Sequence, residues 1–355
     1  MLEFKCFTEW NQLPKNSDAL FAQAEKDSLF FSRIWFENLV STALSDTHTF
    51  LLVCVVDVSD SDISDQVLAI LPLIRPKNPN HDKQWTSLHH LYSSLYTLLL
   101  VDNNQQQILS CLAKGLSQLP FDSLILEPIA DDDKNINNLR QLMGSHGLSC
   151  MRYARFFNWY HLLQGQSFLA YMQARPSRVR NTIARKQRKL KREYGYEVRL
   201  YKGNDVQQAM LDYNAVFDAS WKTPERFKDV MDGFTNSFTK LAWTRLAILY
   251  IEGKPVAAQL WFVAHKKASI FRLAYDEAWK KYSTGSIITQ YMMEYVIDTD
   301  KVEEIDYLTG NDRYKQEWMS EKRQRWRLVF TRNKMEREES MNFLHRLMRS
   351  WIKNS

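Results

Sequence analysis

A short turn rich in hydroxyl side chains is the stretch of this sequence best suited to bind an anion. Ser283, Thr284, Gly285 and Ser286 open a predicted helix whose apolar residues recur at helical spacing. The first turn of a helix has unpaired N–H groups and a partial positive charge, and a glycine lets a phosphate approach that backbone closely. The turn therefore predicts an anion site, and an ordinary N-cap formed by Ser283 or Thr284 is the alternative interpretation.

The segments on either side of this turn predict a β-α-β unit. Residues 268–275 alternate with the period of a strand, and residues 304–308 supply a returning strand after the helix. A crossover of this length makes the two strands parallel, and ligands favour the crevice beyond the carboxyl ends of such strands. We therefore expect the helix start and the ends of both strands to form one site.

A basic segment lies between the two halves of the chain, at residues 175–194. A narrow apolar stripe and a glycine at its end predict a helix that docks along one side. A solvated surface helix is the usual interpretation of such a run, but nine cations without a carboxylate repel one another, which favours an anionic partner. The cations are Arg175, Arg178, Arg180, Arg185, Lys186, Arg188, Lys189, Lys191 and Arg192.

Charge and composition limit the classes of protein that this sequence fits. Formal net charge is −6 for residues 1–155 and +12 for residues 156–355, so an anionic partner belongs to the second half. The 4 cysteines are scattered without a C-x-x-C pair, which is typical of reduced thiols. The sequence shows no signal peptide and no apolar run long enough to span a bilayer. We expect a cytoplasmic protein without a membrane span or a metal site.

The order of predicted elements repeats once along the 355 residues. Each half reads as strand, strand, strand, helix, strand, and in the first half the third strand is assigned to residues 91–101. We expect an α/β fold of two domains, residues 1–155 and 156–335, followed by a C-terminal helix over 336–355. The helix of the first copy begins after Asp102 without a glycine, and this carboxylate would repel a phosphate.

Four groups of residues in the second half resemble the GNAT acyltransferase superfamily, specifically its CelD/BcsL type associated with cellulose and exopolysaccharide synthesis. The resemblance covers about residues 176–327 and implies paired GNAT folds, each a mixed sheet flanked by helices, as in Fem-type transferases. The four groups are Arg178, Arg185 and Arg188; residues 253–258 (GKPVAA); Tyr275 and Asp276 with Ser283, Thr284 and Gly285; and Asp306 with Gly310, Tyr314 and Lys315.

The resemblance implies that acyl-CoA, with acetyl-CoA as the expected donor, lies between the two parallel strands where they splay apart. Its pyrophosphate would bind the amides of Thr284, Gly285 and Ser286, with Ser283 beside them. Of the common GNAT loop, Q/R-x-x-G-x-G/A, only Gly285 is present here, which leaves acyl carrier protein as an alternative donor.

Attack of an amine on a thioester requires a neutral amine and a proton for the departing thiolate. Asp306 and Asp276 are candidates to accept the ammonium proton, and a structural cap or salt bridge is the alternative for each. Tyr314 occupies the place where many GNAT enzymes present a tyrosine that protonates the leaving sulfur. Lys315 could bind a phosphate or pair with Asp312. No serine-histidine-acid arrangement or metal-ligand spacing supports a hydrolase or a metalloenzyme.

These residues together predict an N-acyltransferase that moves an acyl group from CoA to an amine, such as an amino sugar or a polysaccharide or cell-envelope precursor. A Fem-like enzyme that uses aminoacyl-tRNA is an alternative, because the basic helix could bind tRNA phosphates through Arg178, Arg185, Arg188 and Lys189. A binding protein without catalysis is the third hypothesis and has the least support in the sequence.

Overall fold

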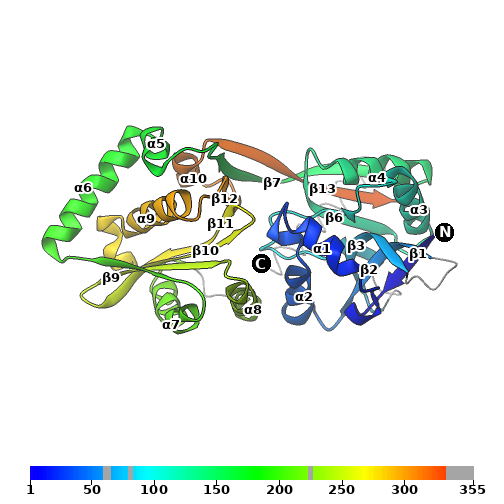
Figure 1. Ribbon diagram of the computed structural model, residues 1–355, viewed down its shortest axis with the longest axis horizontal. Coiled ribbons are helices and arrows are strands. Elements are labelled where there is room, and N and C mark those ends of the chain that lie inside the picture. Colours follow the sequence, from blue (N-terminus) through cyan, green and yellow to red (C-terminus); the bar gives the residue numbers. More distant parts are fainter. Residues whose placement is uncertain (59–64, 79–82, 223–226, 333–355) are drawn as a thin grey trace.

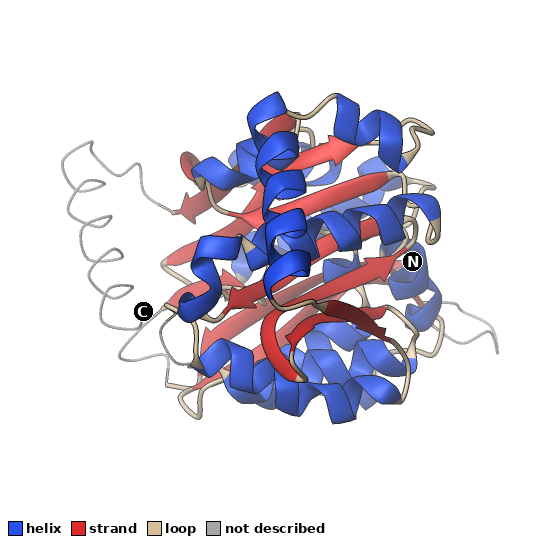
Figure 2. Cartoon of the chain, turned by 90° about the vertical axis from the view of Figure 1, so that its left-hand side faces the viewer, coloured by secondary structure: helices blue, strands red, loops and turns tan. Residues whose placement is uncertain are grey.

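The protein forms one large mixed sheet with helices on both faces (Figure 1, Figure 2). The computed structural model describes residues 1–58, 65–78, 83–222 and 227–332. Among these residues the sheet has 13 strands, ordered β1-β2-β3-β4-β6-β13-β7-β12-β11-β10-β9-β8, and β5 pairs with β3 outside this path. The predicted helix 336–355 lies outside the described residues.

The elements divide into two halves in chain order. The first half contains β1 (Leu2–Phe7), α1 (Ser17–Ala24), η2 (Leu29–Phe31), α2 (Arg33–Thr42), β2 (His48–Asp57), β3 (Gln66–Pro76), β4 (Gln84–Ser87), β5 (Leu99–Leu100), α3 (Gln105–Gln118), β6 (Ser123–Ala130), α4 (Lys134–Ser145) and β7 (Ser149–Leu162). The second half contains α5 (Phe168–Gln173), α6 (Ser177–Glu193), β8 (Glu197–Tyr201), α7 (Asp205–Asp218), α8 (Lys228–Lys240), β9 (Thr244–Ile251), β10 (Lys254–Ala264), β11 (Lys267–Tyr275), η3 (Glu277–Tyr282), α9 (Thr284–Asp298), β12 (Glu304–Thr309), α10 (Arg313–Trp318) and β13 (Glu321–Thr331).

The two halves repeat one order of elements, from β1 to β7 and from β8 to β13. In each copy a strand, two helices and three strands precede a helix, a strand, another helix and a last strand, and the two-residue β5 is additional to this order in the first copy. The strands on either side of the central helix are parallel in both copies: β4 pairs with β6, and β11 with β12. The predicted tandem of two mixed α/β folds is therefore confirmed.

One predicted strand of the first copy is corrected by the structure. Residues 91–101 contribute only β5, whereas the strand parallel to β6 is the short β4, which was not predicted. Within the misassigned run Tyr96, Leu98 and Leu99 are buried. An apolar run can thus fill the core without joining a ladder, and its composition alone resembles that of a buried strand.

The last strand of each copy joins the two halves into one sheet. β7 pairs with β12 of the second copy, and β13 lies between β7 and β6 of the first copy (Figure 1). The predicted boundary between residues 155 and 156 falls inside β7, so the strand that ends the first copy also supports the second.

A shared hydrophobic core below the sheet fixes the two copies against each other. The rings of Trp35 on α2 and Phe234 on α8 stack with centroids 3.9 Å apart. Asn38 donates a hydrogen bond to the carbonyl of Val230 at 3.1 Å. A Cβ atom at Gly233 would lie 1.9 Å from Oδ1 of Asn38, so glycine is required for this approach of α2 to α8. This packing fixes α2 of the first copy against α8 of the second.

Candidate active site

The predicted crevice exists where β11 and β12 part from each other. The two strands are paired only from Lys267 to Ser269 and from Glu304 to Asp306, and beyond these residues no ladder joins them in the described structure. A pocket of about 240 Å³, the α9 pocket, opens beside the free ends of the strands. Its lining residues are Trp221, Leu273, Tyr275, Gly285, Ser286, Thr289, Tyr307, Tyr314, Glu317 and Trp318. Strand splaying thus creates the space that the resemblance to GNAT enzymes implied.

Gly285 and Ser286 at the start of α9 line this pocket, whereas Thr284 is buried beside it in the chain. Ser283 has a left-handed φ of 56°, and its side chain does not cap the helix. Ser286 and Ile287 donate their amide hydrogens to the carbonyl of Ser283, whereas no acceptor for the amides of Thr284 and Gly285 is found in the described part of the chain. The ordinary N-cap is therefore not formed, and two N–H groups stay available at the positive end of the helix.

Close packing explains why the second residue of α9 is a glycine. A Cβ atom on Gly285 would lie 3.0 Å from the ring of Tyr275, which lines the same pocket. The buried Gln259 on β10 fixes this turn further, because its Nε2 donates to Thr289 Oγ1 at 2.6 Å and to the carbonyl of Gly285 at 3.3 Å. The Nε1 of Trp261 donates to Oε1 of Gln259 at 2.9 Å. The amides of the helix start are thus held in place before any ligand binds.

Tyr314 lies where two pockets meet. It lines the α9 pocket and also a neighbouring pocket of about 110 Å³, and Leu273 and Tyr307 are shared by both. Its side chain packs edge-on against Tyr307 with ring centroids 5.7 Å apart, and the residue remains 40% exposed. Burial of the hydroxyl, assisted by the charge of Asp312, raises the pKa of Tyr314 above the ordinary value for tyrosine. Tyr314 therefore keeps its proton at neutral pH.

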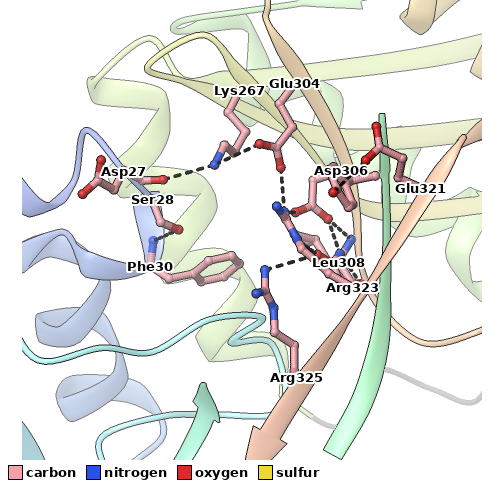
Figure 3. A network of polar contacts seen from close by, with 12 residues as sticks. Asp27, Ser28, Phe30, Lys267, Glu304, Asp306, Leu308, Glu321, Arg323 and Arg325 are labelled. Atoms are coloured by element: carbon pink, nitrogen blue, oxygen red, sulfur yellow. Dashed lines mark hydrogen bonds and ion pairs between the residues drawn. The ribbon is translucent and has the colours of Figure 1, made fainter. Parts of the chain in front are cut away.

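Asp306 is buried on the other face of β12 from Tyr307. Its carboxylate pairs with Arg323 at 2.6 Å and accepts hydrogen bonds from Asn158 Nδ2 at 2.5 Å and from the amide of Leu308 at 2.6 Å (Figure 3). Burial alone would raise the pKa of Asp306, but the charge of Arg323 and the hydrogen bond from Asn158 prevail and lower it. The general-base role stays a prediction, and these contacts favour the structural alternative.

The other predicted site residues have structural partners. Lys315 is buried, and its Nζ donates to the carbonyls of Tyr307 and Thr309 and pairs with Asp312 at 3.3 Å, so it holds the end of β12. Burial lowers the pKa of Lys315. Asp276 caps η3 by accepting the amide of Ala278 at 2.9 Å. Neither side chain lines the α9 pocket.

Comparison with known proteins agrees with this geometry. Residues 177–316 match the family described as acetyltransferase (GNAT) domain. The second half carries a GNAT-type acetyltransferase domain. The protein is an acyltransferase, and the matched residues contain β11, α9, β12 and Tyr314, while Glu317 and Trp318 of the α9 pocket lie just beyond the match. The search of curated proteins found no match.

Solved structures with the same fold have very different sequences. FemX is 9% identical and superimposes with a TM-score of 0.61, covering 91% of this chain and 96% of its own. A conserved protein of unknown function from Bacteroides thetaiotaomicron is 12% identical with a TM-score of 0.53, covering 93% of this chain and 100% of its own. L-PGS from Bacillus licheniformis is 12% identical with a TM-score of 0.51, covering 88% of this chain and 94% of its own. These likenesses show the fold alone.

The basic helix α6 lies at the outer end of the GNAT domain, beyond α9 (Figure 1). Arg185 and Arg188 are exposed, while Lys189 lies over the ring of Tyr282 at 5.3 Å and Arg178 pairs with Glu317. None of these four cations lines the α9 pocket. Arg175 precedes the helix and is buried, donating to the carbonyl of Trp318 at 2.8 Å, so it does not belong to the basic face.

Several residues of the site were not predicted from the sequence. Trp221 is half exposed and its ring lies 4.4 Å from that of Tyr275, at the mouth of the α9 pocket. Gln259 was also missed, although a polar residue within the apolar run 256–264 is a signal that could have identified it. No helix in the described ranges has the length and apolar character needed to cross a membrane.

Proposed function

We propose that the protein transfers an acyl group, in the first place acetyl, from CoA to an amine acceptor. The observation that carries this proposal is the junction of two pockets at Tyr314, with free amides of α9 at the far end of one of them. A donor in the α9 pocket and an amine in the neighbouring pocket would meet beside the tyrosine. An amino sugar or a precursor of a polysaccharide or of the cell envelope is the acceptor suggested by the CelD/BcsL resemblance.

The donor would be held mainly by backbone groups and aromatic walls. In this proposal its pyrophosphate accepts hydrogen bonds from the free amides of Thr284 and Gly285 at the positive end of α9, beside Ser286. The pantetheine arm extends along Leu273 and Tyr275, which line the pocket together with Trp221. An arm between splayed strands can also pair with the unused backbone groups of β11.

The chemistry then needs one proton donor at the sulfur. The neutral amine attacks the thioester carbonyl, the carbon–sulfur bond breaks, and Tyr314 gives its proton to the departing thiolate. The hydroxyl is protonated at neutral pH, as the role requires, although its raised pKa makes it a weaker acid than a free tyrosine. The amine loses its own proton to water in the neighbouring pocket, and Asp306, in this scheme, positions β12 rather than accepting that proton.

A donor attached to a macromolecule is the second candidate, and the exposed cations of α6 favour it. Arg185 and Arg188 lie on a helix whose packing against α9 and η3 brings the basic surface near the donor end of the pocket. Acyl carrier protein or aminoacyl-tRNA would present an anionic surface to these side chains while its thioester or ester enters the crevice.

Calorimetric titration with acetyl-CoA is the experiment that tests the first candidate. We expect saturable binding with a dissociation constant between about 1 μM and 1 mM, the usual range for enzyme substrates. Titration with acylated carrier protein and a gel shift with tRNA at several salt concentrations test the second. Tight, salt-dependent binding of tRNA without any binding of acetyl-CoA would replace the CoA proposal.

A further inference from the structure

Three arginines on β13 point to one side of the sheet where the two halves of the molecule meet. Arg323, Arg325 and Arg327 alternate along the strand, so their side chains share a face. Arg323 pairs with Glu304 and Asp306 at 2.6 Å each, and Arg327 pairs with Glu127 of the first half at 2.6 Å. The outer two arginines are thus neutralised, one by each half of the molecule.

Arg325, between them, is buried without a counter-ion. It is 4% exposed, and its Nη2 makes one long hydrogen bond of 3.3 Å to the neutral Oδ1 of Asn158. Among the residues the structure describes, its Nε has no hydrogen-bond partner, and no carboxylate lies within ion-pair distance. Burial and the repulsion of Arg323 lower the pKa of Arg325 to about 10, which still leaves it charged at neutral pH. A buried charge without a counter-ion lowers the stability of the folded protein by several kcal/mol unless a ligand or further hydrogen bonds compensate it.

A small cavity lies directly beside this guanidinium. It has a volume of about 20 Å³ and is lined by Arg325, Arg323, Lys267 and three serines, Ser28, Ser94 and Ser269. Figure 3 shows the Arg325 guanidinium in the space between Phe30 of the first half and Arg323. The volume suits a single water-sized particle and excludes larger molecules.

Both cations and carboxylates surround the cavity. Lys26, Lys267, Arg323 and Arg325 line it, together with Glu25, Asp27 and Asp306. Lys267 and Arg323 pair with Glu304 and Asp306, whereas Arg325 has no ion pair among the described residues. One monovalent anion would satisfy the free donor of Arg325.

We propose that this cavity, the junction cavity, binds one halide-sized monovalent anion on Arg325. The site is separate from the acyl-transfer site, because it lies on the face of β12 that carries Asp306 and not on the face that carries Tyr307. It does not depend on the donor that the enzyme uses. The anion would stabilise the contact between the two halves, since its ligands come from β11 and β13 on one side and from the first half on the other.

The test measures thermal stability with sodium chloride exchanged for sodium gluconate at constant ionic strength, because gluconate is too large for the cavity. We expect a saturable rise in Tm of about 2–4 °C with chloride in the parent protein. Arg325→Met removes the charge at similar length, so it should show no chloride response and melt no earlier than the parent in gluconate. Arg199→Met removes an exposed arginine of β8 and should keep the full response.

Crystals of the unmodified protein soaked in sodium bromide give a second measurement that does not depend on a variant folding. We expect an anomalous peak within hydrogen-bonding distance of the Arg325 guanidinium. No peak there, or an equal chloride response in the Arg325→Met and parent proteins, would overturn the proposal. Either result would mean that water satisfies the donor.

Discussion

The two copies of the fold place a helix start at the same point, but acidic side chains surround it in the first copy and mostly uncharged ones in the second. Both α9 and α3 follow a residue with left-handed φ, Ser283 at 56° and Asn104 at 54°, and neither has a side-chain cap. The pocket beside α3 is larger, at about 540 Å³. The acidic residues that line it are Asp27, Asp102, Asp132 and Asp133, with Lys134 as the only cation among its described lining residues.

The same backbone geometry at a helix start thus occurs in two different charge environments. Asp102 was predicted from the sequence to oppose a phosphate, and three further aspartates act in the same direction. In the second copy no acidic side chain but Glu317 lines the α9 pocket, and Glu317 pairs with Arg178. We therefore assign donor binding to the second copy alone.

The substitution with the largest expected effect is Gly285→Asp. Its side chain would press against Tyr275 and place a carboxylate where the donor phosphate binds, so acetyl-CoA affinity should fall more than about a hundredfold. The measurement is calorimetric titration, with circular dichroism to verify folding. Gln106→Asp introduces an aspartate at the equivalent second position of α3 and should leave affinity unchanged. An equal loss of acetyl-CoA affinity in both variants, or no loss in either, would contradict the proposal that only the second copy binds the donor.

Tyr314→Phe should lower kcat by about a hundredfold, the usual size of a general-acid contribution, with little change in donor affinity. The physical reason is the loss of a protonated, partly exposed hydroxyl that lines both pockets. In steady-state kinetics, the loss of kcat caused by Tyr314→Phe should be smaller for a donor whose thiolate is a better leaving group. The control is Asn135→Ala, at the equivalent second position of α4, for which we expect the parent rate. A Tyr314→Phe enzyme with unchanged kcat would remove the tyrosine from the mechanism.

Each copy contains one buried carboxylate paired with an arginine of β13, and these carboxylates should contribute alike to stability. Asp306→Asn and Glu127→Gln each leave an arginine with fewer charged partners, so we expect the free energy of unfolding to fall by about 3–5 kcal/mol. Urea denaturation measures the loss. If Asp306 were the general base, its variant would instead fold normally, bind donor and lose about a hundredfold or more in kcat/KM.

Acid should weaken the same two interactions. Burial raises the pKa of Asp306 and of Glu127. Their charged and hydrogen-bonding partners have the larger effect and lower the pKa of each carboxyl in the folded state. Their stabilisation is therefore complete above the ordinary carboxyl pKa of about 4 and is lost as the pH falls below it. Unfolding measured from pH 7 to pH 3 should show this decline, and Asp306→Asn should make it shallower. A decline of equal slope in the variant would mean that other carboxylates cause it.

The smallest effect is expected from replacing Arg185, Arg188 and Lys189 of α6 with glutamine. Acetyl-CoA affinity should change only a few-fold, because these side chains do not line the α9 pocket. For a tRNA donor, in contrast, the slope of log affinity against log salt should fall by about two units. Gel shifts over a salt series distinguish the outcomes. A full loss of acetyl-CoA binding would place these cations at the donor site, contrary to the geometry described above.

The sequence by itself determined most of the order of elements, with the third strand of the first copy as the exception, and it located the glycine turn that begins α9. Alternation over 268–275, the glycine of the α9 turn and the basic run of α6 are local patterns, and local patterns are decided by neighbours in the chain. The acidic character of the first copy was likewise visible as a charge difference between the halves. The α/β tandem fold and the GNAT-type domain followed from these features.

Only the tertiary structure decided which side chains share a site. Asp306 and Tyr307 are adjacent in sequence, yet the pleat of β12 turns one toward the junction cavity and the other toward the α9 pocket. The partners of Asp306, Asn158 and Arg323, come from β7 and β13, two strands that join the copies across the sheet. A pairing such as that of Asn158 with Asp306 joins residues more than a hundred positions apart in the chain. The periodicity of the sequence cannot predict such a contact.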